Sequence, residues 1–564
     1  MKPFIVIKTL IALSLFCLPS VASEKSFSGS YLAANSAMSS SNFSTALKYY
    51  KTVIDQDPTD LKNLNNALLS AVSLGDFKTA EKIASHYELI DGQSETTRLV
   101  LETVAISKNN FSMVLDTKIE DPQLNSLIKQ LTRAWAFLGE GKMADAKTTF
   151  NEIAENPSFT SYARYHEALA VATAGDFEEA EKILSGKKYG TLNLNSRGME
   201  AYAQILVQLE KKTAAKELIN KILLNGVNPN LMALRERINT NKSINYDFVI
   251  NARQGIAEVY LNVAVFLGKN AEPIQVLIYS RVAEHLRPNH APTSLYLAEV
   301  LEQIEQYELA VKVYSSVKPT DPNYVLAEIG RAETLVSLNK VDESIEVLKS
   351  LSKSHGKYFI VHYSLGGMLK INDQNKEAIA AYTFAIDLAS LTSQDNWKMY
   401  FYRGIIHETV KDFTSMENDL RMALQKSPDQ PEVLNFLGYS LVEQKIKLDE
   451  ALIMIQKAVL KKPESGYITD SLGWIYYRLQ KYQQAVEPME RAIKLLPGDP
   501  IVNDHLGDVY WKVDRFIEAE FQWKRSLSFS PEEKEADRIR KKLKFGLDQV
   551  LKEEQGDITL ETND

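Results

Sequence analysis

One recurring motif restricts this chain to a narrow class of folds. Leu-Gly pairs end at Gly438, Gly473 and Gly507, which are 35 and 34 residues apart. An alanine, a large side chain, a small side chain and a proline follow each pair at matching offsets. These residues are Ala451, Ile455, Ala458 and Pro463; Ala485, Met489, Ala492 and Pro497; and Ala519, Trp523, Ser526 and Pro531. A period of this length is typical of units that each consist of two antiparallel helices and stack on their neighbours.

The residue types of the motif have mechanical explanations. We expect the small residues, such as Gly473 and Ala485, to lie where the two helices of a pair approach most closely. We expect the large residues, such as Met489, to fill the space toward the next pair. Each proline ends the second helix, because it cannot continue the helix and forces the residue before it into an extended conformation. The repeats therefore predict an all-α solenoid of helix hairpins.

The same register extends upstream of the motif. Its structural signature positions are Ala298, Gly366, Gly404, Gly438, Gly473 and Gly507 in the first helices, and Ala310, Ala378, Ala451, Ala485 and Ala519 in the second helices. A weaker copy of the pattern covers residues 27–238. Within it, Gly75-Asp76-Phe77 and Gly175-Asp176-Phe177 predict a tight turn followed by a helix cap. In all, the sequence predicts about fourteen repeats.

Segments without the repeat pattern set the predicted boundaries. Residues 239–251 are rich in Asn, Thr and Ser, and they predict a linker between an N-terminal array (27–238) and a C-terminal array (252–531). Residues 532–551 carry apolar side chains four positions apart, which predicts one capping helix. Residues 552–564 are charged and predict a disordered acidic tail.

The amino terminus has the order of a secretory signal peptide. Lys2 and Lys8 precede and flank an apolar run, and small residues stand before Glu24. The single cysteine, Cys17, lies within this segment and follows Phe16, whereas a lipoprotein signal requires a small residue there. We expect cleavage after residue 23, no strong membrane anchor and a periplasmic location, with peripheral contact to the outer membrane as a further option.

Charge and motif content exclude several classes of function. The chain has 65 basic and 73 acidic residues, a balance that argues against nucleic acid as a partner. The eight histidines form no metal-binding spacing, and the sequence contains no GxSxG motif, phosphate-binding loop or GxGxxG motif. We therefore expect no enzymatic activity, no cofactor and no metal.

The repeat motif resembles that of the tetratricopeptide repeat (TPR) superfamily, which implies a right-handed superhelix that binds proteins. Over residues 434–527, the stretches LNFLGYS, GYITDSLGWIYYRL and PIVNDHLGDVYWKV resemble the last repeats of exported proteobacterial TPR proteins. Some of those relatives are outer-membrane lipoproteins, and at least one is an adaptor for a carboxy-terminal processing protease. The resemblance implies a protein or peptide partner, with an envelope protease as one option.

In a TPR superhelix, the concave wall is lined by positions 2, 5, 9 and 12 of each first helix, where the glycine of the Leu-Gly pair is position 8. The candidate partner-binding residues on or beside this wall are Phe401, Asn435, Tyr439, Tyr467, Asp470, Trp474, Tyr477, Arg478, Asp504, Asp508, Trp511 and Lys512. Aromatic side chains supply contact area at low entropic cost, so the set predicts a peptide groove. The alternative is that the rings pack between adjacent first helices.

Three hypotheses for the function follow from these features. The first is a non-catalytic periplasmic scaffold or adaptor in envelope protein assembly or proteolysis. The second is a structural protein that self-associates without a client. The third, an enzyme, has no recognisable motif to support it.

Overall fold

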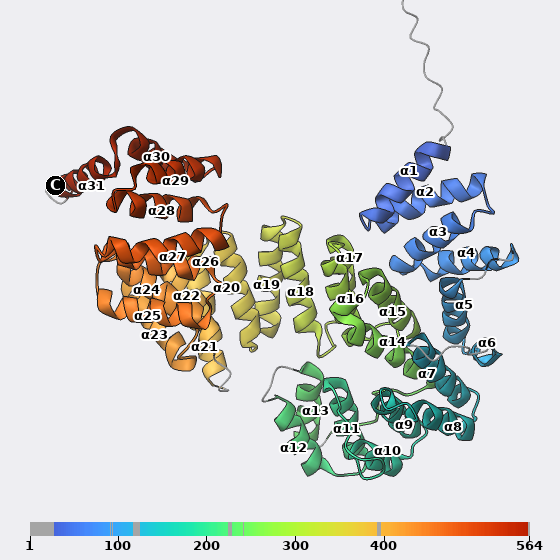
Figure 1. The fold of residues 1–564 in the computed structure, drawn as a ribbon. Helices are drawn as coiled ribbons and strands as arrows, with labels where there is room; N and C mark the ends of the chain where they lie inside the picture. The colour runs from blue at the N-terminus through green and yellow to red at the C-terminus, as the bar shows by residue number, and fades with distance from the viewer. Residues whose placement is uncertain are drawn as a thin grey trace, which may run out of the picture. The chain divides into compact units, whose positions relative to one another are not determined.

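The computed structural model describes residues 27–561, apart from 91, 93, 117–123, 224–227, 241 and 392–395. Within these residues every regular element is a helix and none is a strand, as Figure 1 shows. The predicted signal peptide lies outside the described residues. The chain divides into two compact units, of which unit 1 ends at Lys340 and unit 2 begins at Val341. The all-α helix-hairpin solenoid is confirmed.

Unit 1 contains the helices up to α18. They are α1 (Phe27–Ser39), α2 (Phe43–Gln56), α3 (Leu61–Ser73), α4 (Phe77–Leu89), α5 (Glu95–Ser107), α6 (Ser112–Asp116), α7 (Leu124–Gly139), α8 (Met143–Ala154), α9 (Thr160–Thr173), α10 (Phe177–Leu184), α11 (Ser196–Gln208), α12 (Lys212–Leu223), α13 (Pro229–Asn239), α14 (Ala252–Leu267), the 3-10 helix η1 (Gly268–Asn270), α15 (Pro273–Leu286), α16 (Ala291–Gln303), α17 (Tyr307–Tyr314) and α18 (Tyr324–Ser337).

The Gly-Asp-Phe turns have the predicted conformation. Gly75 and Gly175 adopt φ of +75° and +92°, a region that glycine reaches without strain. The side chain of Asp76 accepts a hydrogen bond from the Thr79 amide at 3.0 Å, and that of Asp176 accepts one from Glu179 at 3.1 Å. Each aspartate therefore caps the second helix of its pair.

The helix pair α14–α15 lies against the first helices of the N-terminal repeats. Helix α14 contacts α7 and α9, and α15 contacts α3 and α5. The approach of α14 to α7 is close, because a Cβ atom on Gly255 would lie 2.3 Å from the Trp135 ring. On α15, Arg281 Nε donates a hydrogen bond to the backbone carbonyl of Ser73, a residue far away in the sequence, at 2.9 Å. Unit 1 therefore encloses a helix pair that the sequence assigned to the second array.

Residues 242–251 of the predicted linker are non-helical, but they do not separate two bodies. Phe248 and Val249 within it are buried, and Thr173 Oγ1 donates to the carbonyl of Val249 at 2.9 Å. The units divide instead after Lys340. The prediction of a boundary at 239–251 was therefore wrong, because apolar burial and a hydrogen bond hold this segment in the core of unit 1.

Unit 2 continues the repeats with helices α19 to α31. They are α19 (Val341–His355), α20 (Phe359–Ile371), α21 (Asn375–Ser390), α22 (Trp397–Thr409), α23 (Phe413–Lys426), α24 (Pro431–Glu443), α25 (Leu448–Lys461), α26 (Gly466–Arg478), α27 (Tyr482–Leu495), α28 (Pro500–Lys512), α29 (Phe516–Ser528), α30 (Glu533–Phe545) and α31 (Leu547–Glu561). Helices α25, α27 and α29 each end before the proline of the motif, as predicted.

The signature glycines lie at close helix approaches. A Cβ atom on Gly473 would lie 2.6 Å from Met489 Cγ, and one on Gly507 would lie 2.4 Å from Trp523 Nε1. These large side chains therefore cover the glycine of their own hairpin. The missing Cβ leaves room for them inside the pair, and Trp523 also faces the next pair, where Lys542 Nζ of α30 lies 5.8 Å from its ring centroid.

The carboxyl-terminal segment forms a helix pair where the sequence predicted one capping helix. Gly546, with φ of +81°, separates α30 from α31. Helix α31 extends to Glu561, through most of the segment predicted as a disordered tail. Arg538 Nε lies 2.7 Å from Glu554 Oε1, so a charged residue of that segment has a partner on α30. Figure 1 shows the pair next to α28 and α29.

Candidate functional site

Most of the predicted wall in the last repeats is buried. Only 7% of Trp474 and 8% of Tyr477 is exposed. The Trp474 ring stacks on Tyr477 at a centroid distance of 4.7 Å and on His505 at 3.9 Å. Its Nε1 donates to Glu443 Oε1 at 2.7 Å. These rings pack between successive first helices, so the prediction that they form an open groove was wrong at this point.

The acidic wall residues are engaged in buried ion pairs. His505 Nδ1 lies 3.0 Å from Asp470 Oδ2, and Lys542 Nζ lies 2.7 Å from both Asp504 Oδ2 and Asp508 Oδ1. Burial lowers the pKa of His505, but Asp470, together with Asp504 and Asp508, outweighs burial, and the net pKa is raised. Burial raises the pKa of Asp508 despite the opposing charge of Lys542. Each of these three carboxylates therefore already has a partner side chain within the protein.

Two further wall residues are tied to the last helix. Trp511 Nε1 donates to Asp548 Oδ2 at 2.9 Å, and Lys512 Nζ also bonds to Asp548. Asp548 belongs to α31, which the sequence did not predict as a separate helix. The pair α30–α31 therefore covers the end of the predicted wall.

The remaining predicted residues keep some exposure. Tyr467 is 62% exposed. Those that are half-buried are Phe401, Asn435, Tyr439 and Arg478. Burial raises the pKa of the Tyr439 phenol, which leaves this side chain neutral. The structure therefore separates the predicted set into packed residues in the middle of α26 and on α28 and more open residues on α22, on α24 and at the two ends of α26, where Tyr467 and Arg478 lie.

The open portion belongs to a line of rings that we call the aromatic stripe: Tyr363 on α20, Phe401 and Tyr402 on α22, and Phe436 on α24. Ring centroids are 6.2 Å apart for Tyr363 and Tyr402, 5.6 Å for Phe401 and Tyr402, and 5.8 Å for Phe401 and Phe436. Tyr402 is 41% exposed, and the other three are half-buried. A connected aromatic surface of this kind can bury a partner's apolar side chains.

Sequence reasoning found only Phe401 of the stripe. Tyr363 occupies position 5 of the preceding repeat, so the same row followed one repeat upstream contains it. Tyr402 and Phe436 both occupy position 6, just beside the predicted rows, and are 34 residues apart. The recurrence of an aromatic residue at one position in successive repeats was the available signal.

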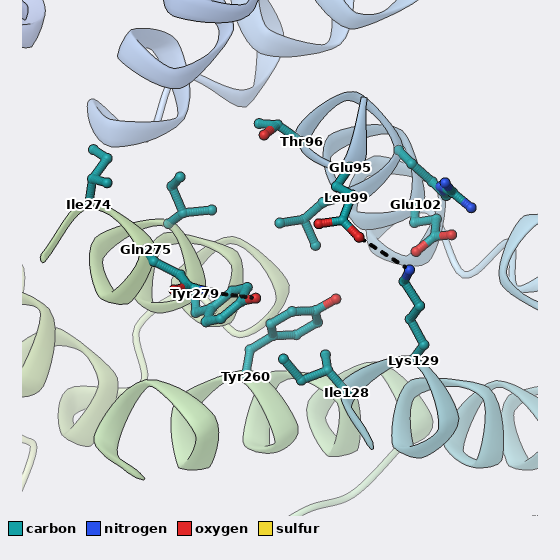
Figure 2. A pocket seen from close by; sticks show the side chains of 12 residues that line it. Glu95, Thr96, Leu99, Glu102, Ile128, Lys129, Tyr260, Ile274, Gln275 and Tyr279 are labelled. Atoms are coloured by element: carbon teal, nitrogen blue, oxygen red, sulfur yellow. Dashed lines mark hydrogen bonds and ion pairs between the residues drawn. The ribbon is translucent and has the colours of Figure 1, made fainter. Parts of the chain in front are cut away.

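Unit 1 carries a separate pocket where its first helices meet α14–α15 (Figure 2). The pocket has a volume of about 200 Å³ and lies between α5, α7, α14 and α15. Tyr260, Tyr279 and Ile128 are among its apolar lining, and the Tyr260 and Tyr279 ring centroids are 5.8 Å apart. Lys129 Nζ lies 3.6 Å from Glu95 Oε1 at the rim. The arrangement can accept one apolar side chain beneath a charged rim.

Family comparisons match both units. A tetratricopeptide repeat model matches residues 131–186, and a second tetratricopeptide repeat model matches residues 471–499. The chain belongs to the TPR superfamily. Proteins of this superfamily generally act as non-catalytic scaffolds that bind other proteins. Among the helices that the structure describes, none combines the length and apolar character needed to cross a membrane.

The TPR chain is similar to a TPR repeat-containing protein of Pseudomonas aeruginosa, with 28% identity over 190 residues. That match covers 34% of this chain and 31% of the relative, so it spans less than a third of the relative's length. Among solved structures, similarity extends to a chain of the APC/C hetero-tetramer Cut9-Hcn1 (16% identity, 92% of this chain and 96% of that chain, TM-score 0.38). It also extends to yeast Tom70 (15% identity, 93% and 96%, TM-score 0.30).

Proposed function

We propose that this TPR protein is a non-catalytic adaptor that holds a partner polypeptide on the aromatic stripe of unit 2. The observation that carries the proposal is the chain of ring contacts from Tyr363 through Tyr402 and Phe401 to Phe436. Rings in the stripe are already ordered by their neighbours, so a partner that buries them loses little side-chain entropy. Tyr439 and the exposed Tyr467 extend the binding surface toward α26.

We further propose that the protein works in the bacterial periplasm, in envelope protein assembly or proteolysis. The amino-terminal sequence supports export, and the resemblance to exported TPR adaptors supports the pathway. Sequencing the amino terminus of the protein purified from the periplasm tests the location. A start near Glu24 is the expected result, whereas retention of Met1 contradicts export.

Site-specific photocrosslinking tests the binding surface. A photoreactive amino acid at Tyr402 is expected to capture a partner in the envelope. The matched control is Ile453 on the second helix α25, which is 66% exposed but lies outside the stripe. Capture at both positions, or only at Ile453, contradicts the stripe as the binding surface. A crosslinked dimer of this chain from position 402 supports the alternative of self-association without a client.

Truncation of the rings separates binding from folding. Tyr402→Ala is expected to weaken binding of the captured partner by about 2 kcal/mol, or about 30-fold, with little change in melting temperature. Trp474→Ala is expected to cost about 3–5 kcal/mol of stability, because Trp474 is buried. If Tyr402→Ala melts early while its folded fraction binds normally, the stripe is part of the core and the proposal fails.

The pocket of Figure 2 offers the partner a second anchor, on unit 1. Leu99 lines this pocket, and Leu99→Trp is expected to fill it and to weaken partner binding. Leu99→Met, which nearly conserves the side-chain volume, is the control and should bind normally. Equal binding by both variants removes this pocket from the proposal and leaves the stripe as the contact.

A further inference from the structure

A polar cavity in unit 1 is separate from the aromatic stripe and from the pocket of Figure 2. It has a volume of about 380 Å³ and is lined by residues of α11, α13 and the connections that precede α14, α16 and α18. The repeat register does not predict it, because nine of its nineteen lining residues lie in connecting segments. Its size falls within the range of small-molecule sites in proteins.

Arg287 lines this cavity with an incompletely bonded guanidinium group. Its Nη2 donates to the backbone carbonyl of Asp247 at 3.2 Å. Its Nη1 is buried, and no group in the described part of the chain accepts a hydrogen bond from it. No carboxylate of the described residues lies within ion-pair distance of Arg287. A buried guanidinium nitrogen without an acceptor is costly, so this one is available to an anionic ligand group.

Glu200 lines the same cavity with a carboxylate that lacks a cationic partner. It is only 7% exposed, and among the described residues it forms no ion pair. The neighbouring Arg197 is committed to Glu258 through bonds of 2.8 and 2.6 Å. Burial raises the pKa of Glu200 more than Arg197 and the Asn230 hydrogen bond lower it. This carboxylate is therefore available to a donor or a cation.

The other charged side chains of the cavity have partners of their own. Arg237 Nη1 lies 3.7 Å from Asp247 Oδ2. Asp321 accepts hydrogen bonds from the amide and the side chain of Asn323 at 2.8 and 3.0 Å. Arg287 and Glu200 thus face one cavity as opposite charges that do not pair with each other.

We propose that this cavity binds a small zwitterion, either a free α-amino acid or a short peptide with both termini free. Its carboxylate would bond to Arg287 and its ammonium group to Glu200. One ligand with both charges would satisfy both side chains, whereas a simple anion or cation would leave one of them unpaired. Arginine also suits the planar geometry of a carboxylate. The proposal goes beyond the adaptor function and does not depend on it.

Calorimetric titration of the full-length protein tests the proposal. The twenty proteinogenic amino acids and the dipeptide alanyl-alanine are titrated singly at millimolar concentration. We expect at least one to bind. For that ligand, the N-acetyl derivative lacks the ammonium group and the carboxamide lacks the carboxylate, and each should bind at least about tenfold more weakly. Binding by the dipeptide alone identifies peptides as the source. Binding by no probe, or equal binding by the modified forms, overturns the proposal.

Variants of the two charged residues link the binding to the cavity. Arg287→Gln and Glu200→Gln should each weaken binding about tenfold or more. The matched control is Arg235→Gln on α13, since Arg235 bonds to Asn220 and does not line the cavity. Glu200→Gln keeps the test valid if Arg287→Gln fails to fold, because it removes a buried charge without changing the side-chain shape. Unchanged affinity in folded Glu200→Gln protein contradicts the proposal.

Discussion

Arg197 on α11 and Glu258 on α14 form a two-point ion pair, with 2.8 Å from Nε to Oε1 and 2.6 Å from Nη2 to Oε2. Glu258 is 1% exposed and also accepts a hydrogen bond from the Tyr165 hydroxyl at 3.1 Å. Burial alone would raise its pKa, but Arg197, together with Arg287 and His166, outweighs burial and lowers the pKa to about 2. This pair joins the N-terminal repeats to α14, the helix that follows the non-helical residues 242–251.

Glu258→Gln should destabilise unit 1 strongly. The substitution leaves Arg197 buried without its carboxylate, which is expected to cost about 3–5 kcal/mol of unfolding free energy. Glu284→Gln is the control, because Glu284 pairs with Arg281 at 2.8 Å but is 28% exposed. Denaturant unfolding of both variants measures the difference. Similar losses of unfolding free energy in the two variants would contradict the prediction that the buried Arg197–Glu258 pair contributes more to stability than the more exposed pair.

The His505–Asp470 pair predicts a dependence of stability on pH. Because the pKa of His505 is raised in the folded protein, its contribution is fully present below its unfolded pKa of about 6.5. The contribution is lost as pH rises through the folded value. The melting temperature of the wild-type protein should therefore fall over this interval, and His505→Asn and Asp470→Asn should flatten the fall. An unchanged slope in both variants would assign the pH dependence to other groups.

Gly473→Ala should destabilise unit 2 by overpacking. The added Cβ would lie 2.6 Å from Met489 Cγ, so the expected cost is about 1–3 kcal/mol. Gly498→Ala is the matched control, since its Cβ would meet no described atom closer than Phe529 Cε1 at 3.8 Å. Chemical denaturation compares the two, and a larger loss in Gly498→Ala would contradict the close approach of α26 and α27.

Lys542→Met should loosen the carboxyl-terminal helix pair. It leaves Asp504 and Asp508 buried together without the ammonium group that lies 2.7 Å from each, at an expected cost of about 3–5 kcal/mol. Hydrogen exchange should show the loss first in α30 and α28. The exposed Lys544 on the same helix supplies the control variant, Lys544→Met. Equal exchange in both variants would mean that the buried triad does not hold α30.

The sequence predicted the hairpin architecture well because its signals act between neighbours. Gly473 and Met489 belong to one hairpin. Asp76 caps its helix by accepting a hydrogen bond from the amide of Thr79, three residues further along the chain. Such contacts recur at constant offsets in the chain, so they leave a periodic pattern. The same pattern placed Phe401 and Trp474 on first helices, but it carries no information on what packs over them.

Exposure of the candidate site was decided by the tertiary structure. Trp474 is buried because His505 of the next first helix stacks on it, and Asp504 and Asp508 are closed by Lys542 of α30. The half-buried Tyr439 and the buried Trp474 both occupy position 9 of their repeats, so periodicity cannot predict how exposed each ring is. The rings of the aromatic stripe, by contrast, stay partly exposed, because the side chains of neighbouring helices cover them only in part.

By itself, the sequence determined that this chain is a TPR solenoid of helix pairs, since that information lies in spacing and in small residues at helix approaches. Only the tertiary structure decided that α14–α15 lies inside unit 1 and that Arg287 and Glu200 share a cavity. The contacts responsible join residues far apart, such as Arg281 and Ser73, which are separated by 208 positions. Each of these long-range contacts occurs once, and a contact that does not recur from repeat to repeat produces no periodic pattern in the sequence.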